Sequence, residues 1–157
     1  MIGRLLLLLF FVIDGCSTSE FAGEVVNVAD GDTFTLLLRN GREQRIRLYG
    51  IDCPERGQSF NRVATAFTRE LLALGDVSVT EMDVDRYGRV VGIVHIADTV
   101  NLNERLLQAG LAWHYRAHDG NPVWAAMELG ARASGSGLWA DPGAVPPWEW
   151  RNRRRNR

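Results

Sequence analysis

Three short segments of this chain contain side chains that suit one kind of chemistry. They are residues 30–33 (Asp-Gly-Asp-Thr), residues 47–55 (Arg-Leu-Tyr-Gly-Ile-Asp-Cys-Pro-Glu) and residues 85–89 (Asp-Arg-Tyr-Gly-Arg). Carboxylates bind hard cations, and the guanidinium fork of Arg holds a phosphate. A further carboxylate can orient or deprotonate an attacking water. The candidates for this chemistry, which together indicate phosphodiester hydrolysis, are Asp32, Arg47, Asp52, Glu55 and Arg89.

Taken one at a time, these residues also have ordinary structural interpretations. Asp32 follows a glycine turn, where Asp is common. Arg47 could pair with another charge on a strand surface, Glu55 could be a solvated loop residue, and Arg89 could cap a turn. Asp30 is expected to support its turn rather than to act chemically. The separate interpretations do not explain why these residue types occur together in this order.

Short strands separated by turns are expected to position these side chains. Alternating apolar residues and turn signals predict strands at 24–29, 33–39, 44–49, 77–82 and 90–96. Apolar residues at helical spacing predict helices at 60–74, 102–108 and 122–134. Five strands with a helix between the third and the fourth favour an α+β, mainly β fold. We therefore predict a five-stranded OB-fold Greek-key barrel with about three helices.

The three motifs, in this order, resemble the staphylococcal nuclease (thermonuclease) family. The match continues through residues 101–112 (Asn-Leu-Asn-Glu-Arg-Leu-Leu-Gln-Ala-Gly-Leu-Ala) and residues 137–139 (Gly-Leu-Trp). It covers about residues 24–142, and three spaced motifs are far more specific than a single Asp-Gly. The resemblance implies an OB-fold barrel with additional helices. It also implies a Ca²⁺-dependent nuclease that cuts DNA or RNA and leaves 3′-phosphate ends.

The resemblance also implies a role for individual residues. Asp32 and Asp52 match the calcium carboxylates, and the backbone carbonyl of Cys53 matches a further calcium ligand. Glu55 matches the residue that activates or places the water. The remaining matches are the two phosphate-binding guanidiniums and a position near the terminal phosphate of the substrate, which are Arg47, Arg89 and Tyr87.

Two departures from the family pattern concern one residue of the second motif and the loop that follows this motif. Cys53 stands where the founding member of the family has Thr, a change that a backbone ligand should tolerate. The long basic loop of that protein is shortened here to Arg56-Gly57-Gln58. Residues 114–118 align poorly, so no aromatic platform for a base is expected there.

Charge is distributed unevenly along the chain. The net charge is −1, but the last seven residues contain five Arg and no acid. Without them, 13 basic residues face 19 acidic ones, a net charge of −6. The tail could bind nucleic acid or an anionic membrane, or it could be an unstructured, solubilising end. Trp148 and Trp150 could dock it on the barrel.

The N-terminal residues have the pattern of an export signal. A basic start is followed by the apolar run 5–13, which is too short to cross a bilayer that needs roughly 20 apolar residues. Residues 13–16 (Ile-Asp-Gly-Cys) resemble a bacterial lipobox, in which Cys16 would be lipidated and become the new N-terminus. Plain secretion and an uncleaved apolar N-terminus are the alternatives.

These patterns predict a division of the chain into four parts. Residues 1–15 form a signal peptide, 16–23 a tether, 24–142 the nuclease domain, and 143–157 a Pro/Trp-rich and then Arg-rich tail. We expect an exported protein, in the cell envelope as a lipoprotein or secreted, and we expect a monomer. Its partners would be nucleic acid and, through Cys16, a membrane.

Two other classes of protein remain as alternatives. OB folds bind single strands readily, so the same barrel could bind nucleic acid at the cell envelope without cutting it. Loss of a carboxylate or an Arg would be expected in such a module, whereas all five residues are present. A structural lipoprotein of the envelope would leave the five residues unexplained.

Overall fold

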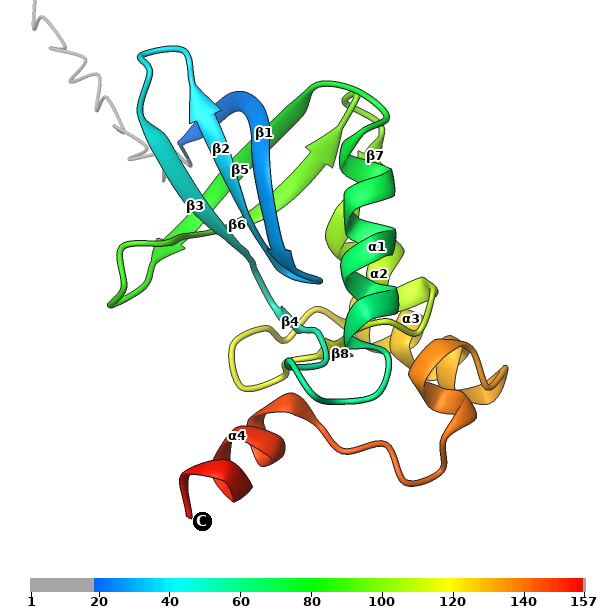
Figure 1. Ribbon diagram of the computed structural model, residues 1–157. Helices are drawn as coiled ribbons and strands as arrows, with labels where there is room; N and C mark the ends of the chain where they lie inside the picture. Colours follow the sequence, from blue (N-terminus) through cyan, green and yellow to red (C-terminus); the bar gives the residue numbers. More distant parts are fainter. Residues whose placement is uncertain (1–18, 157) are drawn as a thin grey trace, which may run out of the picture.

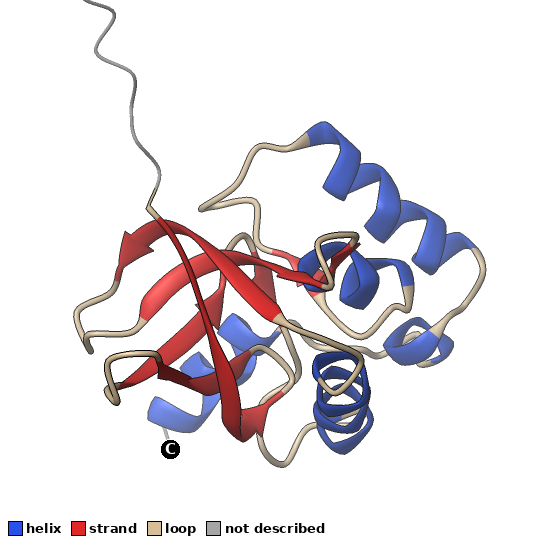
Figure 2. Ribbon diagram, turned by 90° about the horizontal axis from the view of Figure 1, so that it is seen from above, coloured by secondary structure: helices blue, strands red, loops and turns tan. Residues whose placement is uncertain are grey.

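The computed structural model describes residues 19–156, and its main element is a closed barrel. Neighbouring strands pair in the order β3-β2-β1-β5-β6, and a parallel pairing of β3 with β6 closes the ring. Figure 2 shows the strands curling round one another. This confirms the predicted α+β, OB-type fold. The barrel strands are β1 (Glu20–Asp30), β2 (Thr33–Leu38), β3 (Glu43–Leu48), β5 (Val77–Val84) and β6 (Val90–Ile96).

Helices pack beside the barrel and across one of its ends (Figure 1). They are α1 (Asn61–Leu72), α2 (Leu102–Gln108), α3 (Pro122–Ala133), the 3₁₀ helix η1 (Gly137–Ala140) and α4 (Pro147–Arg155). The first three match the predicted helices closely. Within residues 19–156, no helix combines the length and apolar character that a bilayer crossing requires.

Two elements differ from the predicted boundaries. Strand β1 begins at Glu20, inside the segment 16–23 that we predicted as a tether, because residues 20–23 pair with β5. The tail contains α4, so residues 147–155 are not an unstructured end. Two-residue strands, which are too short for a sequence pattern, add β4 (Ile51–Asp52), β7 (Val100–Asn101) and β8 (Trp113–His114).

The core lies inside the barrel and under the helices. Alternate residues of β6 are buried, as expected for a strand with one face against the core. Helix α2 brings Asn103 into this core, where its side chain is fully buried. The Asn103 amide accepts a hydrogen bond from Val94 N at 3.1 Å and donates to the carbonyl of Tyr49 at 2.9 Å. Asn103 thereby ties β6 to the end of β3, next to the β4 turn.

Candidate active site

The candidate site lies where the chain leaves β3 and passes through β4 into the loop 53–60, at the lower end of the barrel in Figure 1. Gly31 allows three segments to meet there. A Cβ at this residue would lie 2.8 Å from Ala64 Cβ and 2.9 Å from Cys53 Cβ. A side chain would push the first motif away from α1 and from the loop, so the close approach requires glycine.

Arg47 joins Asp32 and Asp52, the two candidate aspartates of the site. Its guanidinium forms an ion pair with Asp32 and another with Asp52, the latter at 2.6 Å between Nη2 and Oδ1. Both carboxylates are nearly inaccessible, with 4% of Asp32 and 1% of Asp52 exposed. Backbone Cys53 N donates to Asp32 Oδ2 at 2.7 Å, which fixes the second motif against the first.

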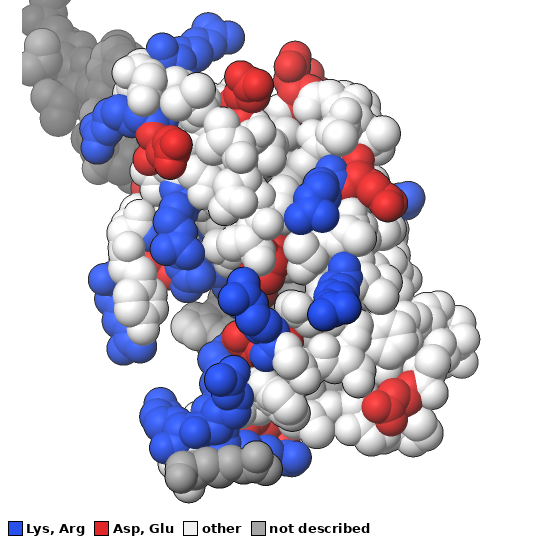
Figure 3. Space-filling view, viewed as in Figure 1, with Lys and Arg blue, Asp and Glu red and all other residues white. Residues whose placement is uncertain are grey.

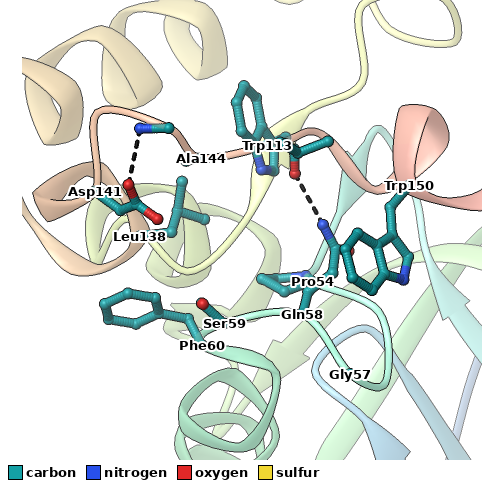
Figure 4. A pocket seen from close by; sticks show the side chains of 12 residues that line it. Pro54, Gly57, Gln58, Ser59, Phe60, Trp113, Leu138, Asp141, Ala144 and Trp150 are labelled. Atoms are coloured by element: carbon teal, nitrogen blue, oxygen red, sulfur yellow. Dashed lines mark hydrogen bonds between the residues drawn. The ribbon is translucent and has the colours of Figure 1, made fainter. Parts of the chain in front are cut away.

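Glu55 lies on the loop 53–60, and nearby side chains hold the backbone of this loop in place. Its N–H donates to Gln58 Oε1 at 2.7 Å, and Asn61 Nδ2 donates to the carbonyl of Pro54 at 2.7 Å. Gln58 also donates to the carbonyl of Val145 at 2.9 Å, across the pocket that Figure 4 shows. The short loop is therefore fastened to α1 and to the C-terminal segment.

The structure adds a guanidinium that the motifs do not contain. Arg151 of α4 donates to Asp52 Oδ2 at 2.8 Å and to Glu55 Oε1 at 2.5 Å. It lies 99 and 96 residues from these partners along the chain. No local pattern could have paired them, although the tail stood out as Arg-rich.

Arg89 and Tyr87 lie on the turn between β5 and β6 rather than among these carboxylates. Arg89 Nε pairs with Asp85 Oδ2 at 2.7 Å, and Asp85 Oδ1 also accepts from Tyr87 N and Arg89 N. Burial opposes ionisation of Asp85, but these hydrogen bonds hold its pKa below the ordinary value. The parallel pairing of Arg47 with Val91 places Arg89 two residues along from Arg47 on the same face of the barrel.

Burial and the closeness of the aspartates to one another disfavour the ionised form of two of them. Burial, with the neighbouring Asp32, raises the pKa of Asp30 to about 7. Burial and Asp32 also raise the pKa of Asp52, despite Arg47 and Arg151. Arg47 overcomes burial at Asp32 and holds the pKa of that carboxyl below its ordinary value. An additional cation at this site would favour the ionised form of these carboxyls.

The donor set suits a hard cation, although it is incomplete by itself. Within residues 19–156, no three His, Cys, Asp or Glu side chains converge as a ready metal site. Asp32 and Asp52 supply carboxylate oxygens, and Ca²⁺ usually completes its ligands with carbonyls and waters. Cys53 is no thiolate ligand, since burial raises the pKa of its thiol. Only its backbone oxygen could take part.

The barrel defines an OB-fold protein, and the acid–guanidinium cluster at its end is a candidate site for a phosphodiester. A family model described as "Staphylococcal nuclease homologue" matches residues 45–141. The chain belongs to this family, which confirms the resemblance carried by the three motifs. Membership places it among the nucleic-acid-hydrolysing enzymes.

Relatives from several bacteria support the same assignment. A protein of Escherichia coli named "Uncharacterized endonuclease" is 40% identical over 136 residues, which cover 87% of this chain and 88% of that protein. A "Micrococcal nuclease" of Shigella flexneri is 41% identical over 149 residues, covering 88% and 84%. Another protein named "Uncharacterized endonuclease", from Haemophilus influenzae, is 33% identical over 146 residues, covering 93% and 82%.

Proposed function

We propose that the protein is a Ca²⁺-dependent phosphodiesterase that cuts DNA or RNA and leaves 3′-phosphate ends. The observation that carries this proposal is the joining of Asp32 and Asp52 through Arg47, with Glu55 beside them on the adjoining loop. Family membership supports the hydrolytic part of the proposal. The convergence of two buried carboxylates, Asp32 and Asp52, supports the cation.

In this proposal Asp32, Asp52 and the carbonyl of Cys53 hold Ca²⁺. The ion, when bound, supplies positive charge to the scissile phosphate. Two observations support this role: the two carboxylates are buried, and Cys53 N is fixed to Asp32. Sulfur chemistry at Cys53 has no part in the reaction.

Glu55 is proposed as the general base. It takes a proton from a water whose oxygen bonds to phosphorus, and the bond from phosphorus to the 5′-oxygen breaks. The products are a 3′-phosphate and a 5′-hydroxyl, whose oxygen takes a proton from solvent. Arg47 and Arg89 stabilise the extra negative charge of the five-coordinate phosphorus, and one such donor commonly contributes about 3–4 kcal/mol.

A digestion assay tests this proposal. The full chain is mixed with single-stranded DNA, with Ca²⁺ or with a calcium chelator, beside Asp32→Ala and Glu55→Gln variants. Glu43→Gln, an exposed carboxylate at the start of β3, is the matched control. We expect cutting that requires Ca²⁺, Asp32 and Glu55 but not Glu43. Unchanged turnover of Asp32→Ala would contradict the assignment, and binding without cutting would favour the binding module.

Glu55→Gln should slow turnover far more than it weakens substrate binding, because the proposed base acts in the transition state. Product ends are read by treating the fragments with a kinase that requires a free 5′-hydroxyl. Fragments that carry 5′-phosphates instead would contradict the proposed direction of cleavage.

Export also remains a proposal, since residues 1–18, with Cys16, lie outside the described residues. We propose that the protein leaves the cytoplasm, with a lipid on Cys16. Fractionation of bacteria that produce the wild-type chain or Cys16→Ser tests this: the wild type should follow the membranes and the variant should not. Equal distribution of the two would discard lipidation.

A further inference from the structure

Helix α4 reaches the candidate active site through Arg151. This side chain is 43% exposed and contacts both a proposed calcium carboxylate and the proposed base. An Arg fork that fits carboxylates also fits phosphates. If Glu55 is to take a proton from water, its ion pair with Arg151 must loosen, and an anionic substrate would offer the guanidinium a new partner.

The position of α4 is fixed by aromatic contacts and by the loop that carries Glu55. Trp148 stacks on Tyr115 at a centroid distance of 5.0 Å and an interplanar angle of 15°, and its edge meets Trp113. Gln58 connects the loop to Val145, just before α4, and Trp150 lies beside the same loop in Figure 4. Arg151 is thus presented to the site by a docked helix.

The remaining arginines of α4 face solvent. Arg153, Arg154 and Arg155 are exposed, and with Arg151 and Glu149 they give the helix a net charge of +3. In Figure 3 basic side chains gather at the lower left, over α4. The chain before residue 151 has a net charge of −6, so this helix offers a concentrated positive surface beside the site.

We propose that α4 is a nucleic-acid-binding arm of the active site. Arg151 exchanges its carboxylate partners for a phosphate of the substrate, and Arg153, Arg154 and Arg155 bind phosphates farther along the strand. Four residues of helix rise about 6 Å. At the spacing of roughly 3.4 Å along one strand of a duplex, that length covers about two spacings and so reaches about three phosphates. This inference rests on the proposed function, because it identifies how the substrate is held.

The solvent-facing part of the arm is tested by binding without cutting. A fluorescent single-stranded oligodeoxynucleotide is titrated with the full chain in a chelator, from 50 to 200 mM salt, and a gel shows that it stays intact. The variant carries Arg153→Gln, Arg154→Gln and Arg155→Gln together. A control carries Arg39→Gln, Arg42→Gln and Arg69→Gln, which remove the same charge from exposed positions elsewhere.

Each phosphate contact on a single strand contributes about 0.7 to the slope of log affinity against log salt. Loss of three contacts should therefore reduce the slope by about 2. Over this salt range, the ratio of wild-type to variant affinity should then shrink by roughly 20-fold. The control variant should keep the wild-type slope. Equal slopes for wild type and α4 variant would overturn the proposal, as would α4-dependent binding to anionic phospholipid vesicles without α4-dependent binding to the oligonucleotide.

Arg151→Gln tests the exchange of partners. Removing the guanidinium leaves Asp52 and Glu55 more negative, so calorimetry should show Ca²⁺ binding about tenfold tighter, the equivalent of one charge-assisted hydrogen bond. The same variant should bind the oligonucleotide more weakly in Ca²⁺, with Glu55→Gln present in both chains to prevent cutting. A merely structural Arg151 would weaken both, and that result would overturn the exchange.

Thermal unfolding of each variant and the near-ultraviolet circular dichroism of the tryptophans, two of which lie on α4, show whether α4 stays docked. The outcomes separate this inference from the proposed function. If the chain cuts DNA but its salt slope does not depend on α4, the inference about α4 is wrong and the proposed function stands. If the chain binds the oligonucleotide through α4 but never cuts it, the inference about α4 stands and the proposed function is wrong.

Discussion

Replacing Asn103 with alanine is expected to lower the free energy of unfolding by about 4 kcal/mol, because it removes the partners of two backbone groups. Val94 N and the carbonyl of Tyr49 now bond to the fully buried amide of Asn103. A buried polar group left without a hydrogen-bond partner costs about 1–3 kcal/mol, and Asn103→Ala leaves two backbone groups in this state. A small cavity adds to the destabilisation.

Asn101→Ala is the matched comparison, since Asn101 lies two residues earlier, as the N-cap of the same helix. Its side chain caps α2 by accepting from Glu104 N at 3.1 Å, and loss of such a cap costs about 1 kcal/mol. Urea unfolding followed by tryptophan fluorescence measures both variants. If Asn103→Ala loses no more stability than Asn101→Ala, the core amide does not hold β6 to the end of β3, and our account of how the site is positioned is wrong.

Three further predictions concern the site and its surroundings. Asp85→Asn should lower the rate of cutting about tenfold through a misplaced Arg89, with at most about 1 kcal/mol lost in stability. Because the pKa of Asp85 is lowered in the fold, its carboxylate contributes to folding stability above about pH 4, and this contribution is lost as the pH falls through the lowered pKa. Stability unaffected by Asp85→Asn at neutral pH would contradict this. In a Cys16→Ser chain, Cys53 should react with a thiol reagent roughly 100-fold more slowly when native than in urea, since it is buried; equal rates would contradict the structure. Gln58→Ala should slow cutting and raise the mobility of α4, measured by tryptophan anisotropy, and an effect on neither would remove Gln58 as the link between them.

The sequence predicted those parts of the site that are close together along the chain. Thr33, next to Asp32, pairs with Arg47, and Asp52 follows Arg47 by five residues, so the pairing of β2 with β3 and the short turn after β3 bring these residues together once the barrel is assumed. The pattern of Asp85 to Arg89 likewise belongs to one turn. Their roles in binding and catalysis stay predictions, whereas the fold and the family are confirmed.

Contacts that depend on docking distant segments could not be predicted in this way. Arg151 meets Glu55 because α4 is docked on the domain, in part by the stacking of Trp148 on Tyr115, and such a stack leaves no periodic signal. The helix itself did have local signals, namely a proline in its first turn, Glu149 after it and arginines at the end. Gln58 lies in the loop that is shortened relative to the family, and its hydrogen-bond partner Val145 is 87 residues away along the chain.

The placement of α4 also makes the far end of the chain a weak point. Trypsin-like proteases cut after Arg, and Arg153, Arg154 and Arg155 are exposed on the last turn of α4, and helix ends commonly fray. Trimming there would leave the barrel intact and the family motifs unchanged. Preparations that differ by a few C-terminal residues would then fold alike, yet respond differently to salt. A purification tag fused after residue 157 would extend from the helix that contacts the active site, whereas strand β1, at the other end of the described chain, begins away from α4 (Figure 1).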